Sequence, residues 1–182
     1  MEYNNVCLYP DSRLYEPTSL VEKVTEEVLQ LGESLLRIAI DINAAGLAAP
    51  QIGQSIKAAV IREAIGEEEK SYFIMNPEII EKSEEMEDSW EGCMSLPGLQ
   101  VPVKRYSKIT VRYMNVKEEY VTLKCSGLLS RAFQHEIDHL NNILLVDRMS
   151  NTQKKRNRHY FKNLEKFCKK LAKKQDICNT SI

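Results

Sequence analysis

The chain has 182 residues, of which 43% are hydrophobic and 28% charged, a balance typical of one folded domain and not of a disordered protein. Lysine and arginine number 25 against 26 acidic residues, so the overall charge predicts no particular partner. Five irregularly spaced cysteines favour free thiols in a reducing compartment, and we expect neither a targeting segment nor a membrane span. These features predict a cytoplasmic globular protein.

The first predicted element is a long amphipathic helix over residues 19–43. Ser19 and Glu22 have the spacing of a capping box, in which each side chain satisfies a backbone donor of the other residue. Apolar residues then recur every three or four positions along one face: Val21, Val24, Val28, Leu31, Leu35, Ile38 and Ile42. Gly32 is a weak point, because glycine costs about 1 kcal/mol relative to alanine in a helix. A coiled-coil strand is the alternative, but the pattern ends after too few heptads.

Between residues 56 and 125 the pattern changes to short β-strands separated by turn residues. The predicted strands are Lys57–Arg62, Ser71–Met75, Glu78–Lys82, Val101–Val103, Lys108–Asn115 and Tyr120–Cys125. Ten acidic residues and two lysines lie between Glu63 and Asp88. We interpret this acidic stretch as solvated hairpin loops.

Two further helices are predicted after the strands. One runs from about Ser126 through Leu140 and is apolar on all sides, which indicates burial. The other begins near Thr152, has an apolar face, and carries ten lysines and arginines against one acid between residues 151 and 175. Strands in the middle with helices at both ends predict an α+β fold. We expect mixed or antiparallel β-sheets packed around the buried helix, which lies between a long N-terminal helix and a basic C-terminal one.

The buried helix carries the string Gln134-His135-Glu136-Ile137-Asp138-His139. His135 and His139 are four residues apart and project from the same face, so both rings can reach one metal ion. Glu136 can stand beside the open position of that metal and accept a proton from bound water. Two of the three histidines in the chain lie here, and the alternative is a hydrogen-bonded pair of core histidines.

Two histidines leave a catalytic metal one protein ligand short. The third histidine of the metzincin proteases is absent, because Asn142 and Leu145 occupy the required glycine and histidine positions. A gluzincin-like protease could use His159 or Glu165, although the surrounding lysines would disfavour a cation there.

Two loops offer further candidates. Cys93 lies in the glycine-containing segment Glu91–Pro97 and could be the third ligand as a thiolate, with an ordinary buried thiol as the alternative. The segment Gly46–Gly53 has small residues that allow close backbone approach, and its Gln51 offers an amide donor. By itself the second segment predicts only a loop and the start of a strand.

Together these segments resemble the peptide deformylase family. Three motifs occur in the order and spacing of that family: G-x-G-x-A-A-P-Q at residues 44–51, E-G-C-x-S at residues 91–95, and Q-H-E-x-D-H at residues 134–139. The sequence departs from the family at Ala44, where a glycine is usual, and at Asn142, which replaces a common glycine. The resemblance covers residues 1–150, predicted as the catalytic domain, followed by a basic helix over 151–175 and a tail over 176–182.

The resemblance implies a metal-dependent hydrolase that acts on a linear amide. Its members remove the formyl group from the initiator N-formylmethionine of new polypeptides and release formate. One divalent metal ion, most often Fe²⁺ with Zn²⁺, Ni²⁺ or Co²⁺ as substitutes, would be held by three ligands: Cys93, His135 and His139. A water molecule would take the fourth position.

By the same resemblance, that water is deprotonated with help from Glu136 and attacks the formyl carbon. The side chain of Gln51 and the backbone amide of Met94 would donate hydrogen bonds to the resulting oxyanion. Glu91 would pair with Arg105 and so fix the loop that carries the cysteine.

Helical spacing places Leu128, Arg131 and Ala132 on the face of the buried helix that also carries His135. These residues could line a pocket for the methionine side chain, with core packing as the alternative. We expect the segment 44–46, which includes Gly46, to hold the peptide extended as an added strand.

The basic C-terminal helix predicts either a solvated surface or a partner-binding face. Related bacterial enzymes carry a terminal helix that contacts the ribosome, so the resemblance implies ribosome contact with a steep salt dependence. We expect no membrane partner and no specific DNA binding. Two alternatives to the deformylase remain: a zinc endopeptidase that uses His159 or Glu165, and a ribosome- or RNA-binding module with a structural metal.

Overall fold

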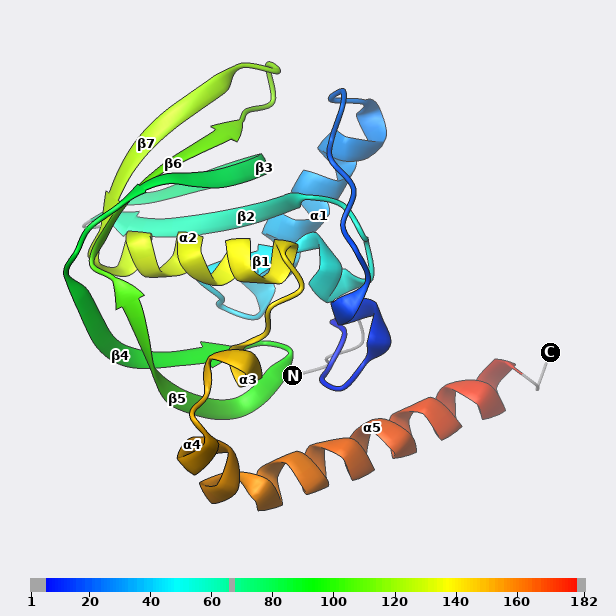
Figure 1. Cartoon of the computed structure of the whole chain (residues 1–182). Coiled ribbons are helices and arrows are strands. Elements are labelled where there is room, and N and C mark those ends of the chain that lie inside the picture. The colour runs from blue at the N-terminus through cyan, green and yellow to red at the C-terminus, as the bar shows by residue number, and fades with distance from the viewer. Residues whose placement is uncertain (1–5, 66–67, 180–182) are drawn as a thin grey trace.

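A five-stranded antiparallel sheet lies on one side of a central helix, α2 (Gly127–Leu140), and a two-stranded hairpin lies on the other (Figure 1). The computed structural model describes residues 6–65 and 68–179. The large sheet has the strand order β1-β2-β3-β6-β7, with the bounds Gly46–Ala48, Ala58–Ile65, Glu68–Lys82, Lys108–Met114 and Tyr120–Ser126. The hairpin consists of β4 (Met86–Cys93) and β5 (Leu96–Tyr106). This arrangement confirms the predicted α+β fold with antiparallel sheets around a buried helix.

Central strands of the large sheet are buried on both faces, because side chains alternate along each strand. Alternate residues of β2 pack against α2 on one face and against helix α1 (Glu26–Asp41) on the other. Phe133 of α2 is fully buried, and its ring lies 6.0 Å from the ring centroid of Tyr72 and 6.2 Å from that of Tyr113. These contacts attach α2 to the large sheet.

Helix α1 is shorter than predicted, because it begins only after Thr25 as the N-cap. The residues before it make long-range contacts instead of helical ones. The backbone amide of Val21 donates to the side-chain oxygen of Asn76, and the side-chain nitrogen of Asn76 donates back to the carbonyl of Val21. The amide of Ser19 bonds to the carbonyl of Ser55. The predicted capping box at Ser19 and the helical start there are therefore wrong.

All six predicted strands fall on observed strands, and two of them, Ser71–Met75 and Glu78–Lys82, are parts of the single strand β3. The pairing register of β3 shifts between Met75 and Glu78, where Asn76 has a φ of 50°. The interpretation of the acidic stretch as loops is wrong, because most of it forms β3 and the unpredicted strand β4. The acidic side chains occupy exposed positions on these strands, as in β4, where the first five residues are exposed.

The predicted C-terminal helix is two helices, α4 (Asn151–Arg156) and α5 (Arg158–Asn179), which follow the short helix α3 (Leu145–Arg148). The helix is interrupted at Asn157, whose side-chain amide donates a hydrogen bond to the carbonyl of Gln153. Because α5 continues to Asn179, the predicted boundary between helix and tail lies inside it. Two short 3-10 helices, η1 (Ser12–Tyr15) and η2 (Ala49–Ile52), complete the fold.

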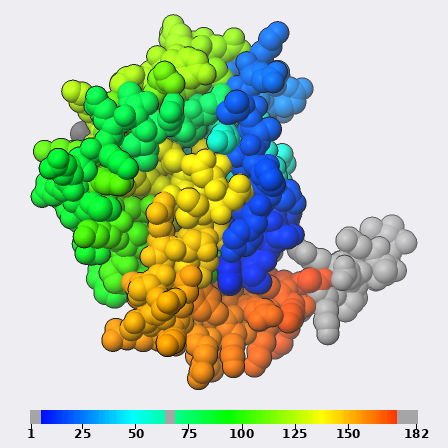
Figure 2. Space-filling model, in the orientation of Figure 1, coloured from blue at the N-terminus to red at the C-terminus, as the bar shows by residue number. Residues whose placement is uncertain are grey.

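The α5 helix, orange to red in Figure 2, runs along the lower face of the molecule. Its apolar side chains pack on a second hydrophobic core, which we call the hairpin cluster: Cys7, Leu8, Leu14, Cys93, Leu96, Leu99, Val101, Val103, Leu144, Leu145, Val146, Met149 and Leu164. Phe167 of α5 lies outside this contact and is 45% exposed. Among the described residues, no helix is long and apolar enough to span a membrane.

Replacing Phe133 by alanine is expected to lower the free energy of unfolding by about 3–5 kcal/mol, because the buried ring leaves a cavity. The matched control is Phe167→Ala, at which the same truncation of a half-exposed ring should cost less than about 1 kcal/mol. Urea denaturation of both variants measures the difference. Equal losses would contradict the assignment of Phe133 as the contact that attaches α2 to the sheet.

Candidate metal centre and substrate cavity

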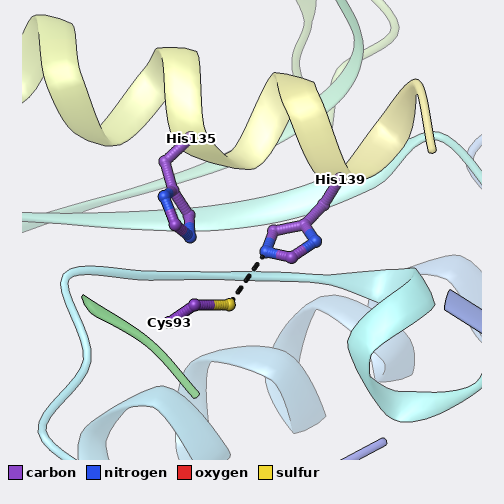
Figure 3. A group of neighbouring side chains, drawn as sticks. All are labelled: Cys93, His135 and His139. Atoms are coloured by element: carbon purple, nitrogen blue, oxygen red, sulfur yellow. Dashed lines mark hydrogen bonds between the residues drawn. The ribbon is translucent and has the colours of Figure 1, made fainter. Parts of the chain in front are cut away.

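Three potential metal ligands from two elements converge beneath α2. His135 and His139 lie one turn apart on α2, and Cys93 lies at the end of β4 (Figure 3). The Cys93 Sγ atom is 3.3 Å from Nε2 of His139, and one ligand atom of each residue lies within 4.8 Å of the others. A tetrahedral ion with bonds of about 2.0–2.3 Å separates its ligands by roughly 3.3–3.6 Å, so small movements would close this site around one ion.

A buried carboxylate orients the first histidine. Glu91 Oε2 accepts a hydrogen bond from Nδ1 of His135 at 3.0 Å, which leaves the Nε2 atom of His135 free to bind a metal. Arg105 donates two hydrogen bonds of 2.9 Å to the same carboxylate, as the sequence predicted, and Arg131 donates a third at 2.7 Å. Burial alone would raise the pKa of Glu91, but hydrogen bonds from His135 and Arg105 hold it well below its usual range.

A second carboxylate extends this network along α2. Asp138 accepts hydrogen bonds from Arg105 at 2.5 Å and from Arg148 of α3 at 2.5 and 2.9 Å. Sequence reasoning assigned no role to either Asp138 or Arg148. The aspartate lies inside the Q-H-E-x-D-H string, so a signal existed for it, whereas nothing in the sequence indicated Arg148.

Glu136 lies beside the three ligands and is 3% exposed. Its Oε2 atom has no hydrogen-bond partner among the residues that the structure describes. A Cβ atom on Gly46 would lie only 2.6 Å from Oε1 of Glu136, so glycine is needed where β1 passes this carboxylate. Burial raises the pKa of Glu136, against the opposing effect of the neighbouring histidines. The carboxylate is thus buried beside the three ligands, with one oxygen available to a further hydrogen-bond donor.

The donor set fits a divalent metal ion. Burial alone would raise the pKa of the Cys93 thiol, but the His139 and His135 rings lower it well below its usual range, which favours the thiolate. The Nδ1 atom of His139 is buried and has no partner in the part of the chain that is described. Two imidazole nitrogens and a thiolate suit iron, nickel, cobalt or zinc, and the donor set does not choose among them.

The oxyanion donors predicted from the sequence also lie at this site. Gln51 is 2% exposed, and its side-chain nitrogen lies 3.6 Å from Cys93 Sγ and 3.3 Å from Ser95 Oγ. The side-chain oxygen of Gln51 accepts from the backbone amide of Ala48 at 2.9 Å, which fixes the orientation of the amide group. Met94 follows the cysteine in the turn between β4 and β5 and lines the same cavity.

A cavity of about 580 Å³ opens beside the ligands. Leu128, Ala132 and Gly46 line this cavity. Leu128 is 82% exposed, so the first turn of α2 is not buried, whereas the sequence predicted a helix buried on all sides. The side chain of Arg131 also borders the cavity, but its guanidinium turns towards Glu91. Trp90, 67% exposed, lines the cavity as well and had no role in the sequence prediction.

The ligands considered for a protease lie elsewhere. His159 and Glu165 are exposed residues of α5, and Glu165 forms an ion pair with Lys169 at 2.8 Å. The described residues bring together only Cys93, His135 and His139 as a potential metal-binding group. The interpretation of His159 or Glu165 as a third ligand is therefore wrong.

This fold and site define a metal-dependent hydrolase, since a histidine pair and a carboxylate on one helix meet a thiol at an open cavity. The profile of the family described as Polypeptide deformylase matches residues 3–155. Peptide deformylases from Desulfotalea psychrophila and Carboxydothermus hydrogenoformans are 40% and 43% identical over 151 and 145 residues, covering 82% and 80% of this chain and 89% and 92% of theirs. The chain belongs to the polypeptide deformylase family.

Solved structures agree with this assignment. A peptide deformylase 1B from Arabidopsis thaliana, crystallised with an inhibitor, superposes with a TM-score of 0.86 at 28% identity and covers 91% of this chain and 92% of its own. The peptide deformylase from Thermotoga maritima gives a TM-score of 0.73 at 35% identity, over 80% of this chain and 96% of its own.

Replacing Gly46 by alanine should lower the free energy of unfolding by about 1–3 kcal/mol, because the added methyl group forces β1 and Glu136 apart. Gly92→Ala is the matched control, since a Cβ atom there meets its nearest neighbour at an ordinary 3.5 Å. The control should change stability by less than about 0.5 kcal/mol. Urea titration of both proteins in the same metal state is the measurement, and equal effects would show that β1 does not press against the carboxylate.

Proposed function

We propose that this protein hydrolyses the formyl group from N-formylmethionine at the start of new polypeptides and releases formate. The observation that carries the proposal is the convergence of three ligand atoms within 4.8 Å, next to a buried carboxylate oxygen that has no partner among the described residues. Both face a cavity bordered by the edge strand β1, where an extended peptide can lie. Family membership supplies the reaction class.

We assign one divalent metal ion to Cys93, His135 and His139, with Fe²⁺ as the native ion and Zn²⁺, Ni²⁺ or Co²⁺ as substitutes. Family membership supports iron as the native ion, since the donor set alone suits all four metals. The thiolate donates charge to whichever ion is bound and softens its Lewis acidity. When bound, the ion acts as a Lewis acid on a water molecule and lowers its pKa.

Glu136 is the general base and then the general acid. Its unpartnered oxygen accepts a proton from the attacking water, and burial raises its pKa so that the same group can hand the proton to the departing amine. The backbone pressed against it at Gly46 keeps the carboxylate at the inner end of the cavity. This position supports proton transfer by Glu136 next to the formyl carbon that is attacked.

The amide group of Gln51 and the backbone amide of Met94 stabilise the oxyanion. Gln51 supports this role because its oxygen is held by Ala48, so its nitrogen points towards Cys93. The edge strand β1 supports substrate binding. Among the strands of the described residues it pairs only with β2, so its other edge is available to an added peptide strand. Leu128 and Ala132 then border the methionine side chain.

Glu136→Gln is expected to lower kcat for formate release from formyl-Met-Ala by about 10²–10⁴-fold, because the amide cannot carry the proton. Anaerobic purification followed by metal analysis should show the parent content of iron in the variant. Glu78→Gln, at an exposed residue of β3, is the control and should keep full activity. Loss of metal from Glu136→Gln would make Glu136 a ligand, and retained activity would place the base elsewhere.

Residues 1–150 are proposed as the catalytic domain of a cytoplasmic enzyme, with residues 151–175 as a basic helix that contacts the ribosome and 176–182 as a tail. The exposed lysines of α4 and α5 support the contact, since a predominantly positive surface attracts RNA phosphate. The apolar face of α5 is occupied by the hairpin cluster, which leaves its basic face for a partner.

Removing basic charge from this surface should weaken ribosome co-sedimentation at low salt and flatten its salt dependence, with a slope in log affinity smaller by about three to four. The variant replaces four exposed lysines by glutamine: Lys155, Lys162, Lys166 and Lys170. The control replaces four exposed lysines outside these helices: Lys104, Lys108, Lys117 and Lys124. Equal co-sedimentation of the two variants would rule out the helix as the contact.

A further inference from the structure

Arg131 joins α2 to both strands of the hairpin. Its Nη1 atom donates to Glu91 Oε1 at 2.7 Å and to the carbonyl oxygen of Val103 at 2.9 Å, and its Nη2 atom donates to the carbonyl oxygen of Glu87 at 2.9 Å. The side chain of Arg131 is 12% exposed. One guanidinium thus binds β4 at two points and β5 at one.

The metal ligands belong to two different hydrophobic cores. Cys93 packs in the hairpin cluster, which contains no residue of α2. The helix that carries His135 and His139 packs instead on the large sheet through Phe133 and Ile137. Tyr106, at the end of β5, is a residue of the hairpin that packs on this second core. Elsewhere along the hairpin, the distance between the thiol and the two rings depends on the polar contacts between α2 and the two strands.

From this geometry we infer that Arg131 is a positioning residue, which clamps the cysteine-bearing hairpin to the histidine-bearing helix. It acts through Glu91, the carboxylate that orients His135. The other polar contacts from α2 to β5 lie near the end of that strand. Ser130 and Gln134 bind the backbone of Tyr106, and Asp138 accepts from Arg105. Only Arg131 reaches from α2 to the middle of both strands, within the described part of the chain.

Removing the guanidinium would leave Glu91 Oε1 with the Arg105 Nε donor alone and would take the side-chain donor from the carbonyls of Val103 and Glu87. Hydrogen bonds to charged groups are the stronger ones, so the lost bond to Glu91 is the most costly of the three. Lysine keeps the charge but has no planar fork, so it cannot satisfy three acceptors in the same arrangement. The expected order of metal retention is therefore arginine, then lysine, then alanine.

The sequence suggested instead that Arg131 lines the methionine pocket, and the two roles differ in what they change. A pocket wall affects KM for the formylated peptide and leaves the metal in place. A clamp affects the retention of the metal and kcat, because ligands and base move relative to each other, and leaves KM nearly constant. The kinetic part of this comparison rests on the proposed function, whereas metal retention can be measured without any activity.

The experiment compares the parent with Arg131→Ala and Arg131→Lys, each loaded with Co²⁺ under anaerobic conditions. Competition against a chelator should show metal affinity weakened about 10- to 100-fold in Arg131→Ala, as for other groups that orient a ligand, and by less in Arg131→Lys. The visible absorption of the bound Co²⁺ should shift in Arg131→Ala. KM for formyl-Met-Ala should change less than about twofold while kcat falls.

Arg112→Ala is the matched control, since Arg112 forms a half-exposed pair with Glu78 and should leave metal affinity and spectrum unchanged. If Arg131→Ala does not fold, the lysine variant decides, and parent-like affinity in that variant overturns the inference. Parent-like metal affinity in a folded Arg131→Ala with a raised KM also overturns it and favours the pocket wall. If the parent itself releases no formate with any metal, the proposed function fails while the affinity comparison still tests the clamp.

Discussion

The structure depends on one contact between distant parts of the chain, the hydrogen bond between Glu91 and His135. These residues are 44 positions apart, and their contact brings a hairpin and a helix from different hydrophobic cores to one point. Because the carboxylate takes one ring nitrogen, the other is directed to the place where the cysteine sulfur lies. Helical spacing alone places the two histidine rings side by side, whereas the contact between Glu91 and His135 places them next to the Cys93 thiol.

The surrounding charges explain how a carboxylate can be buried there. Glu91, Arg105 and Asp138 are each at most 11% exposed in their side chains, and positive and negative groups alternate along the network. A buried ion pair is often close to neutral for stability, whereas removing one member costs several kcal/mol, because the remaining charge is unpaired. Such a network is therefore a means of fixing geometry more than a source of stability, and its geometry is what a metal site requires.

Much of the fold followed from periodicity, and the errors have physical causes. The bounds of α2 were confirmed, and all six predicted strands fall on observed strands, because burial on one or two faces leaves a clear pattern of apolar residues. The start of α1 was missed because Val21 continues the apolar pattern but has its backbone bonded to Asn76, 55 residues away. The β4 strand was missed because acidic residues at exposed strand positions look like a loop. Gly32 was interpreted as a weak point of the helix. A Cβ atom there would lie 2.7 Å from the Phe73 ring, so the glycine allows this ring to pack against α1.

The ligands and the carboxylate were predictable from motifs, whereas the partners that hold them were not. Spacing alone identified His135 and His139. The glycine-containing loop offered Cys93 as a third ligand, and the resemblance then assigned it to the metal. The contacts of Arg131 and Arg148 depend on how a helix crosses a hairpin, which no local pattern records. The sequence therefore predicts the ligands and the carboxylate better than it predicts the hydrogen-bond partners that orient them.

The shortness of β1 has a consequence for turnover. Its free edge spans only Gly46–Ala48, and the amide of Ala48 is already bonded to Gln51. Long bare edges recruit other chains and risk aggregation, whereas so brief a template offers a visiting peptide very few main-chain partners. A peptide held by so few main-chain hydrogen bonds would dissociate easily, and little of its binding free energy would depend on the later residues of the peptide. Under the function proposed above, so short an edge implies weak main-chain binding of the substrate and rapid release of the product peptide.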